Sequence, residues 1–220
     1  MNKLLSLTLI AIALSMSACD QFKGDKGSTG AKGKDGVIIV LVPTPTPKTQ
    51  IEEVVQTENE YREVLGQAPL TKGLVCTLYT VPNTTTALAS ASLTTVSSYL
   101  YRGDFNQPNS VSSLGLNILP PALKSIYKDW IVVRCTGKLV VTESDYYFFD
   151  LSTDDGSMLY VGGSTVINND GMHGITTKSG FKFLRLGVHD FRVDFLQGAG
   201  SQALILKMDS STIINSNLYH

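Results

Sequence analysis

Two carboxylates, Asp154 and Asp155, lie side by side in this 220-residue sequence and are followed by Gly156 and Ser157. Adjacent carboxylates at a loop tip repel each other unless a cation or several hydrogen-bond donors compensate their charge. Calcium suits such a pair, because it takes six to eight oxygen ligands at about 2.4 Å and tolerates irregular loops. Neither this loop nor Asn168-Asn169-Asp170-Gly171 has the spacing of an EF-hand. Any calcium site would therefore form where loops meet across a folded domain.

Catalytic patterns are weak by comparison. The three histidines, His173, His189 and His220, lack the paired spacing of a zinc site, and no Gly-x-Ser-x-Gly motif occurs. Gly198 to Ala203 matches a dinucleotide fingerprint by letters, but a strand follows where that motif needs a helix, so we expect a hairpin turn. Asp154 and Asp155 are adjacent and poorly placed to flank a glycosidic bond from opposite sides. We therefore predict a protein that is not an enzyme.

Cys19 follows a segment with the features of an export signal. Lys3 supplies a positive charge, and the apolar run from Leu4 to Met16 would rise only about 20 Å as a helix, less than the hydrocarbon core of a membrane. Met16-Ser17-Ala18-Cys19 resembles the processing box of bacterial lipoproteins. The resemblance implies that residues 1–18 are a signal peptide and that Cys19 carries a covalent diacylglycerol lipid. An ordinary signal peptide with a chance cysteine is the alternative.

This anchor predicts where the protein resides. A lipid with two or more acyl chains is a durable membrane anchor. We expect an exported protein held in the cell envelope, at the inner or the outer membrane, with its domain in the periplasm or at the cell surface. The sequence has 18 basic and 19 acidic residues, so no basic field draws in nucleic acid.

The two other cysteines, Cys76 and Cys135, form an even pair in an oxidising compartment. A disulfide between them would close a loop of about 60 residues and stabilise the fold by roughly 4 kcal/mol. Two buried free thiols are the alternative.

Residues 19–48 form the predicted spacer. Glycine recurs at every third position from Gly24 to Gly36, which is the spacing of a collagen triple helix, although no proline accompanies it. The glycine repeat could form either a flexible polar spacer or the stalk of a homotrimer, and both alternatives remain open. The apolar run from Val37 to Val42 needs a partner strand in the domain or in another copy. The prolines from Pro43 to Pro47 favour an extended linker.

Residues 49–66 have a helical pattern, with Thr49 as cap, Glu52 three residues later and Gly66 as the stop signal. The apolar residues expected on one helix face are Ile51, Val54, Val55, Tyr61, Val64 and Leu65. Such a face would either pack on the core of the domain or pair with another helix in a short coiled coil.

Residues 67–220 form the predicted domain, in which the apolar period changes to two. The segments expected as strands are Leu74–Tyr79, Trp130–Arg134, Asp145–Leu151, Met158–Val161, Phe181–Leu186, Val188–Leu196 and Ala203–Met208. The stretch from Thr84 to Ser113, rich in Ser, Thr and Asn, is expected to contain long loops. The pattern predicts an all-β fold, an antiparallel β-sandwich or barrel.

Several motifs between Trp130 and Met208 occur in the order seen in one known family. They include Tyr147-Phe148-Phe149, Asp154-Asp155-Gly156-Ser157, Leu159-Tyr160-Val161-Gly162-Gly163, Gly171-Met172-His173 and Leu186-Gly187-Val188-His189. Together they resemble the anthrax protective-antigen fourteen-kilodalton (PA14) domain family. The resemblance implies a β-sandwich that usually serves as a glycan-binding module in glycosidases, toxins and microbial adhesins. In its adhesin members, paired aspartates bind calcium, and the calcium holds sugar hydroxyls.

Carried over to this sequence, the resemblance implies calcium ligands at Asp154 and Asp155, with Asn168, Asn169 and Asp170 as further candidates. The leading hypothesis is a non-catalytic, lipid-anchored module that recognises glycans or a cell-surface partner through these loops. One alternative is that the Asp-Asp-Gly turn only holds backbone amides. Another is a structural role, as the tip of a trimeric fibre or surface adhesin without a metal-dependent glycan site.

Overall fold

The computed structural model describes residues 49–111, 114–212 and 217–220. The predicted signal peptide, Cys19, the glycine repeat and the Val37–Val42 run lie outside the described residues. Among the helices that are described, none is long and apolar enough to cross a membrane.

The described chain contains one long helix, two short helical turns and twelve strands. The helical elements are α1 (Gln50–Val64), η1 (Leu88–Ser90) and α2 (Pro121–Lys124). The strands are β1 (Leu74–Thr80), β2 (Thr94–Tyr101), β3 (Asn106–Val111), β4 (Ile131–Val141), β5 (Asp145–Asp154), β6 (Ser157–Val161), β7 (Ser164–Asn169), β8 (Thr176–Leu184), β9 (Gly187–Gln197), β10 (Ser201–Met208), β11 (Ser211–Thr212) and β12 (Leu218–Tyr219).

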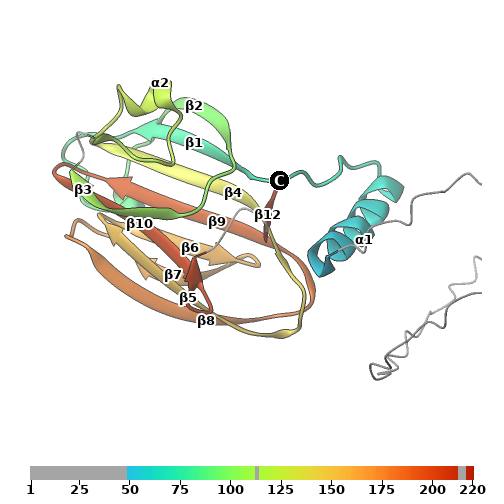
Figure 1. The fold of residues 1–220 in the computed structure, drawn as a ribbon. Coiled ribbons are helices and arrows are strands. Elements are labelled where there is room, and N and C mark those ends of the chain that lie inside the picture. Colours follow the sequence, from blue (N-terminus) through green and yellow to red (C-terminus); the bar gives the residue numbers. More distant parts are fainter. Residues whose placement is uncertain (1–48, 112–113, 213–216) are drawn as a thin grey trace, which may run out of the picture. The chain divides into compact units, whose positions relative to one another are not determined.

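The strands form two antiparallel sheets that pack face to face (Figure 1). Sheet A has the order β2-β1-β4-β9-β6-β7, with β12 also paired to β4. Sheet B has the order β11-β10-β5-β8, with β3 also paired to β10. The two sheets remain separate, so the predicted all-β sandwich is confirmed.

The core lies between the inner faces of the sheets. Its largest fully buried side chains are Phe105, Phe149, Phe191 and Phe195. Strand alternation explains the burial of Phe149, since its neighbours Phe148 and Asp150 point to the other face. This packed core holds the strand ends, and therefore the loops, in place.

Cys76 and Cys135 form a disulfide, as predicted. The two residues lie directly opposite each other in the register of β1 and β4, and both are fully buried. The bond therefore joins neighbouring strands of sheet A at the inner face.

Helix α1 begins at a capping box. The Thr49 side chain accepts from the backbone N–H of Glu52, and the Glu52 carboxylate accepts from the backbone N–H of Thr49. Gly66 follows the helix with a φ of +67°, which suits glycine. The predicted helix and both of its end signals are confirmed.

Only the first half of the apolar face expected on α1 packs on the domain. Ile51, Val54 and Val55 pack with Leu70, Val140 and Tyr219 on the outer face of sheet A. In contrast, the exposed side chains at the other end of the helix are Tyr61, Val64 and Leu65. The sheet covers only the first turns of the helix, so the last turn has nothing apolar to pack against.

The stretch from Thr84 to Ser113 contains β2 and β3, whereas the sequence predicted mainly long loops. Strand β2 pairs with the edge of β1, and most of its side chains are exposed or half-buried. Its Ser and Thr residues therefore need no apolar alternation, which removed the signal on which the prediction relied.

Candidate functional site

The two loops that carry the candidate calcium ligands meet at one end of the sandwich. Strand β5 ends at Asp154, and the Asp154–Asp155 peptide bond is cis. A Cβ atom at Gly156 would lie 2.7 Å from the carbonyl oxygen of Gly171 and 2.9 Å from its nitrogen. A side chain at position 156 would therefore push the two loops apart.

Asp155 ties three loops together. Its Oδ1 accepts a hydrogen bond from the backbone N–H of His173 at 3.1 Å, and its Oδ2 accepts one from the backbone N–H of Gly198 at 2.8 Å. Asp155 is 6% exposed and Asp154 is 7% exposed. Two adjacent carboxylates are thus withdrawn from water, with backbone donors as part of their compensation.

Burial raises the pKa of both carboxyl groups above the usual value for aspartate. For Asp154, burial is the largest cause and the charge of Asp155 adds to it, while His173 and the backbone of Ile175 lower the pKa. For Asp155, burial is again the largest cause, and the N–H groups of Gly198 and His173 lower the pKa. Because the ionised forms are disfavoured, a bound cation would stabilise this pair.

Asp170, from the second loop, is engaged in contacts that hold backbone. Its Oδ1 accepts from the N–H of Leu88 at 2.6 Å and from that of Gly171 at 2.8 Å. Its Oδ2 accepts from the N–H of Ala89 at 3.1 Å. The carboxylate therefore anchors η1 to the loop after β7.

Asn169 is buried, whereas Asn168 is exposed. The Asn169 side-chain nitrogen donates to Thr153 Oγ1 at 3.0 Å and to the carbonyl oxygen of Thr176 at 3.1 Å. This orientation leaves the amide oxygen of Asn169 as the atom that a cation could use. Asn168 Oδ1 accepts from the N–H of Asp170 at 3.1 Å and shapes the loop.

The donor chemistry fits calcium. In the described ranges, no three side chains of His, Cys, Asp and Glu gather closely enough to hold a metal ion. Calcium also accepts amide and backbone carbonyl oxygens and water. The two carboxylates and the amide oxygen of Asn169 would supply part of its oxygen ligands, and water would supply the others. Zinc prefers nitrogen and sulfur donors, and both ring nitrogens of His173 at this junction lie against carbonyl oxygens, those of Gly174 and Asn169.

The raised pKa values predict a pH dependence. In the unfolded chain these aspartates titrate near pH 4, and in the folded domain they titrate at higher pH. Protonation of these two carboxyl groups therefore stabilises the folded domain relative to the unfolded chain. This stabilisation is fully present below about pH 4 and is lost as the pH rises through the folded pKa values. We expect Asp154→Asn, in a chelator, to gain stability relative to the unmodified chain as the pH rises from 4 to 7.

Urea denaturation at several pH values, followed by the fluorescence of Trp130, measures this difference. Excess calcium is expected to reverse the advantage of Asp154→Asn, because the cation stabilises only the ionised pair. A stability difference that stays constant from pH 4 to 7 would contradict the assignment.

The backbone donors of this site were missed in the sequence. His173 was considered only as a zinc ligand, yet its N–H holds Asp155, and its ring lies between carbonyl oxygens of Gly174 and Asn169. The expected hairpin at Gly198 is wrong, because the turn passes from β9 in sheet A to β10 in sheet B. Only the repeated glycines at Gly198 and Gly200 signalled a close backbone approach.

A second surface was also missed, on the outer face of sheet B. Tyr146 faces Phe183 across β5 and β8, and Phe148 faces Phe181. The ring centroids of these pairs lie 5.3 Å and 5.9 Å apart, and the four side chains are 47–64% exposed. We call these four residues the aromatic ladder. The sequence signal for the ladder was that Tyr146 and Phe148 lie on the strand face opposite to that of the buried Phe149.

The fold and the loop junction define a two-sheet antiparallel sandwich with a paired-aspartate loop. Residues 120–217 match the family model described as the PA14 domain, and this range contains α2, the strands from β4 to β11 and the loop junction around Asp155. The family resemblance predicted for this region is thereby confirmed. No curated protein sequence matches the chain.

Solved structures support the PA14-like fold. A PA14 sugar-binding domain from an RTX adhesin aligns with a TM-score of 0.51 and 20% identity, over 67% of this chain and 97% of that one. The PA14 domain of the MpAFP antifreeze protein has a TM-score of 0.51 and 12% identity, over 69% of this chain and 91% of that one.

An anti-sigma factor domain-containing protein from Clostridium clariflavum aligns with a TM-score of 0.52 and 22% identity. The match covers 68% of this chain and 47% of that one, so the chain spans about half the length of that protein. At these identities the comparison establishes the fold.

Proposed function

We propose that this protein is a non-catalytic binding module that recognises glycans through the loop junction around Asp154 and Asp155, with calcium as part of the site. The observation that carries the proposal is the buried aspartate pair at the meeting point of three loops. The PA14 match and the similarity to the PA14 sugar-binding domain from an RTX adhesin support the choice of ligand class.

In the proposed site, Asp154, Asp155 and Asn169 hold the cation. Calcium keeps part of its coordination shell for water, and sugar hydroxyls can replace that water. The chain's own residues set the position of the ion, since Asp155 is fixed by the N–H groups of His173 and Gly198. Catalysis is not proposed, because carboxylates on adjacent residues cannot flank a glycosidic bond at about 5 Å or more from opposite sides.

A glycan array with the chain from Asp20 to His220 tests the proposal. We expect binding to a subset of glycans in calcium, and loss of that binding in chelator or in Asp154→Ala. Asp145→Ala is the matched control, since Asp145 is exposed at the opposite end of β5. Binding that survives both chelation and Asp154→Ala would overturn the calcium part, and an array without any bound glycan would overturn the ligand class.

We further propose that a diacylglycerol on Cys19 anchors the module to the cell envelope, and that residues 19–48 act as its spacer. An extended spacer would place the module up to about 100 Å from the membrane. Partition of the protein into detergent, lost in Cys19→Ala, is the expected result. Equal partition of the two proteins would contradict the anchor.

The second candidate function is structural, as the tip of a homotrimeric fibre. The aromatic ladder favours it, because exposed apolar clusters of this kind mark contacts between proteins. Light scattering on the chain from Asp20 is expected to give a trimer mass that falls in Phe148→Ser. A monomeric mass at micromolar concentration would count against this role.

A further inference from the structure

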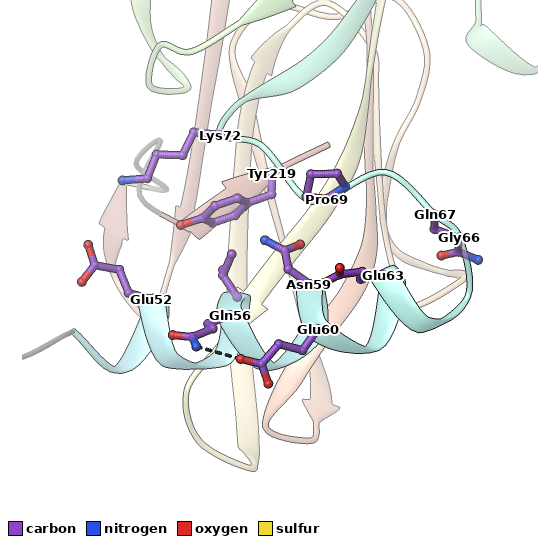
Figure 2. Close-up of a pocket in the computed structure, with 11 residues that line it drawn as sticks. Glu52, Gln56, Asn59, Glu60, Glu63, Gly66, Gln67, Pro69, Lys72 and Tyr219 are labelled. Atoms are coloured by element: carbon purple, nitrogen blue, oxygen red, sulfur yellow. Dashed lines mark hydrogen bonds between the residues drawn. The ribbon is translucent and has the colours of Figure 1, made fainter.

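A groove with a volume of about 810 Å³ lies between helix α1 and the segment from Gly66 to Lys72, with Tyr219 at its inner side (Figure 2). It shares no lining residue with the loop junction at Asp155. One wall is a stripe along α1, and its residues are Glu52, Val55, Gln56, Asn59, Glu60 and Glu63.

The groove is held open by hydrogen bonds between its two walls. Asn59 Oδ1 accepts from the N–H of Leu70 at 2.6 Å, and Arg62 Nε donates to the carbonyl oxygen of Ala68 at 2.7 Å. Thr71 exchanges backbone hydrogen bonds with His220 at 2.9 and 3.0 Å. The helix and the following segment are thus fixed to each other and to β12, so the groove is preformed.

The charge of the groove is one-sided. Three glutamates line it, Glu52, Glu60 and Glu63, against a single lysine, Lys72. In the described part of the chain, neither Glu60 nor Glu63 takes part in an ion pair, and both are exposed. A ligand of positive charge is therefore complementary to this surface.

Tyr219 supplies the groove with a hydrogen-bond donor. It is 4% exposed, and no hydrogen bond to its hydroxyl occurs among the described residues. Figure 2 shows its ring projecting between α1 and Lys72, with the hydroxyl on the side of Glu52 and Lys72. Burial, followed by the charge of Glu52, raises the pKa of Tyr219, so the hydroxyl stays protonated and can donate. The buried side-chain atoms without a partner in the described residues are those of Tyr99, Gln197 and Gln202, so the Tyr219 hydroxyl is accessible from the groove and can donate to a ligand there.

The dimensions indicate an extended ligand. From Glu52 to Glu63 the helix rises about 17 Å, which matches about five residues of extended chain. Between the carboxylates, Val55, Pro69 and the ring of Tyr219 offer apolar surface. Lysine and arginine suit such a surface, because their aliphatic stems pack on apolar groups while their charged ends remain at the rim.

We propose that this groove binds an extended peptide segment that carries lysine or arginine side chains. The glutamates of α1 pair with the cationic ends, and the Tyr219 hydroxyl bonds to the peptide backbone or to an amine. The site is separate from the proposed glycan site, so the protein would hold a basic polypeptide at one surface and a sugar at another.

Calorimetry with hexalysine, on the chain from Asp20 to His220 at low salt, tests the proposal. We expect binding that weakens about fivefold in Glu60→Gln with Glu63→Gln, and about threefold in Tyr219→Phe. The matched control is Glu53→Gln with Glu58→Gln, which makes the same charge change on α1 outside the groove. The control pair is expected to bind within about twofold of the unmodified chain.

Three results would overturn the proposal. An absence of hexalysine binding shows that the groove is not a site for basic peptides. Equal weakening in the groove and control pairs shows general attraction to an acidic helix. Spermidine that binds as tightly as hexalysine shows a small-amine site in place of a peptide groove. Circular dichroism of each variant checks that α1 is intact.

Discussion

Replacing both Cys76 and Cys135 with alanine lowers the free energy of unfolding by about 4 kcal/mol. The bond spans a sequence separation of 59, so its loss frees a long loop in the unfolded chain. Both side chains are fully buried, and the two small cavities left by the sulfurs add to the loss. Urea denaturation, followed by the fluorescence of the single Trp130, gives this value.

The unmodified chain in a reducing agent serves as the control for packing. It loses the covalent link but keeps both sulfur atoms, so its stability is expected to lie between the other two. A double variant within about 1 kcal/mol of the oxidised chain would show that the hydrogen-bonded ladder of β1 and β4 alone sets the stability of this region.

Asp155→Ala is expected to lower the free energy of unfolding by about 2–4 kcal/mol in chelator. The substitution leaves the N–H groups of His173 and Gly198 without their acceptor in a buried place. Each unsatisfied donor costs about 1–3 kcal/mol, and removal of the buried charge offsets part of this loss. Chemical denaturation in chelator measures the effect, and calcium is expected to enlarge the difference.

Asp145→Ala is again the matched control, because Asp145 is exposed and bonds only to the adjacent N–H of Tyr146 among the described side-chain contacts. It is expected to change stability by less than about 0.5 kcal/mol. If Asp155→Ala were equally mild, the three loops would be held together by contacts other than the Asp155 carboxylate.

The sandwich could be predicted because most strands carry an apolar period of two, as Phe149 and Leu151 do in β5. The disulfide followed from cysteine counting, and α1 from the pairing of Thr49 with Glu52. Strand β2 could not be predicted, since a Ser- and Thr-rich edge strand needs no apolar face.

The aspartate pair of the candidate site was found from the sequence because two adjacent carboxylates repel each other and need compensation, which can be recognised from the residue types alone. The partners of Asp155 were not found, because a backbone N–H such as that of Gly198 has no side-chain signature. The structural role of Asp170 was likewise hidden, since it depends on η1, which lies 81 to 82 residues away in the chain.

Calorimetric titration of calcium into the chain from Asp20 to His220 tests the central claim most directly. The paired-aspartate site predicts a saturable heat of binding that is absent in the Asp154→Ala, Asp155→Ala double variant and retained in Asp145→Ala. A folded, unmodified chain that gives no calcium heat would contradict the claim, and the loop junction would then be a structural turn.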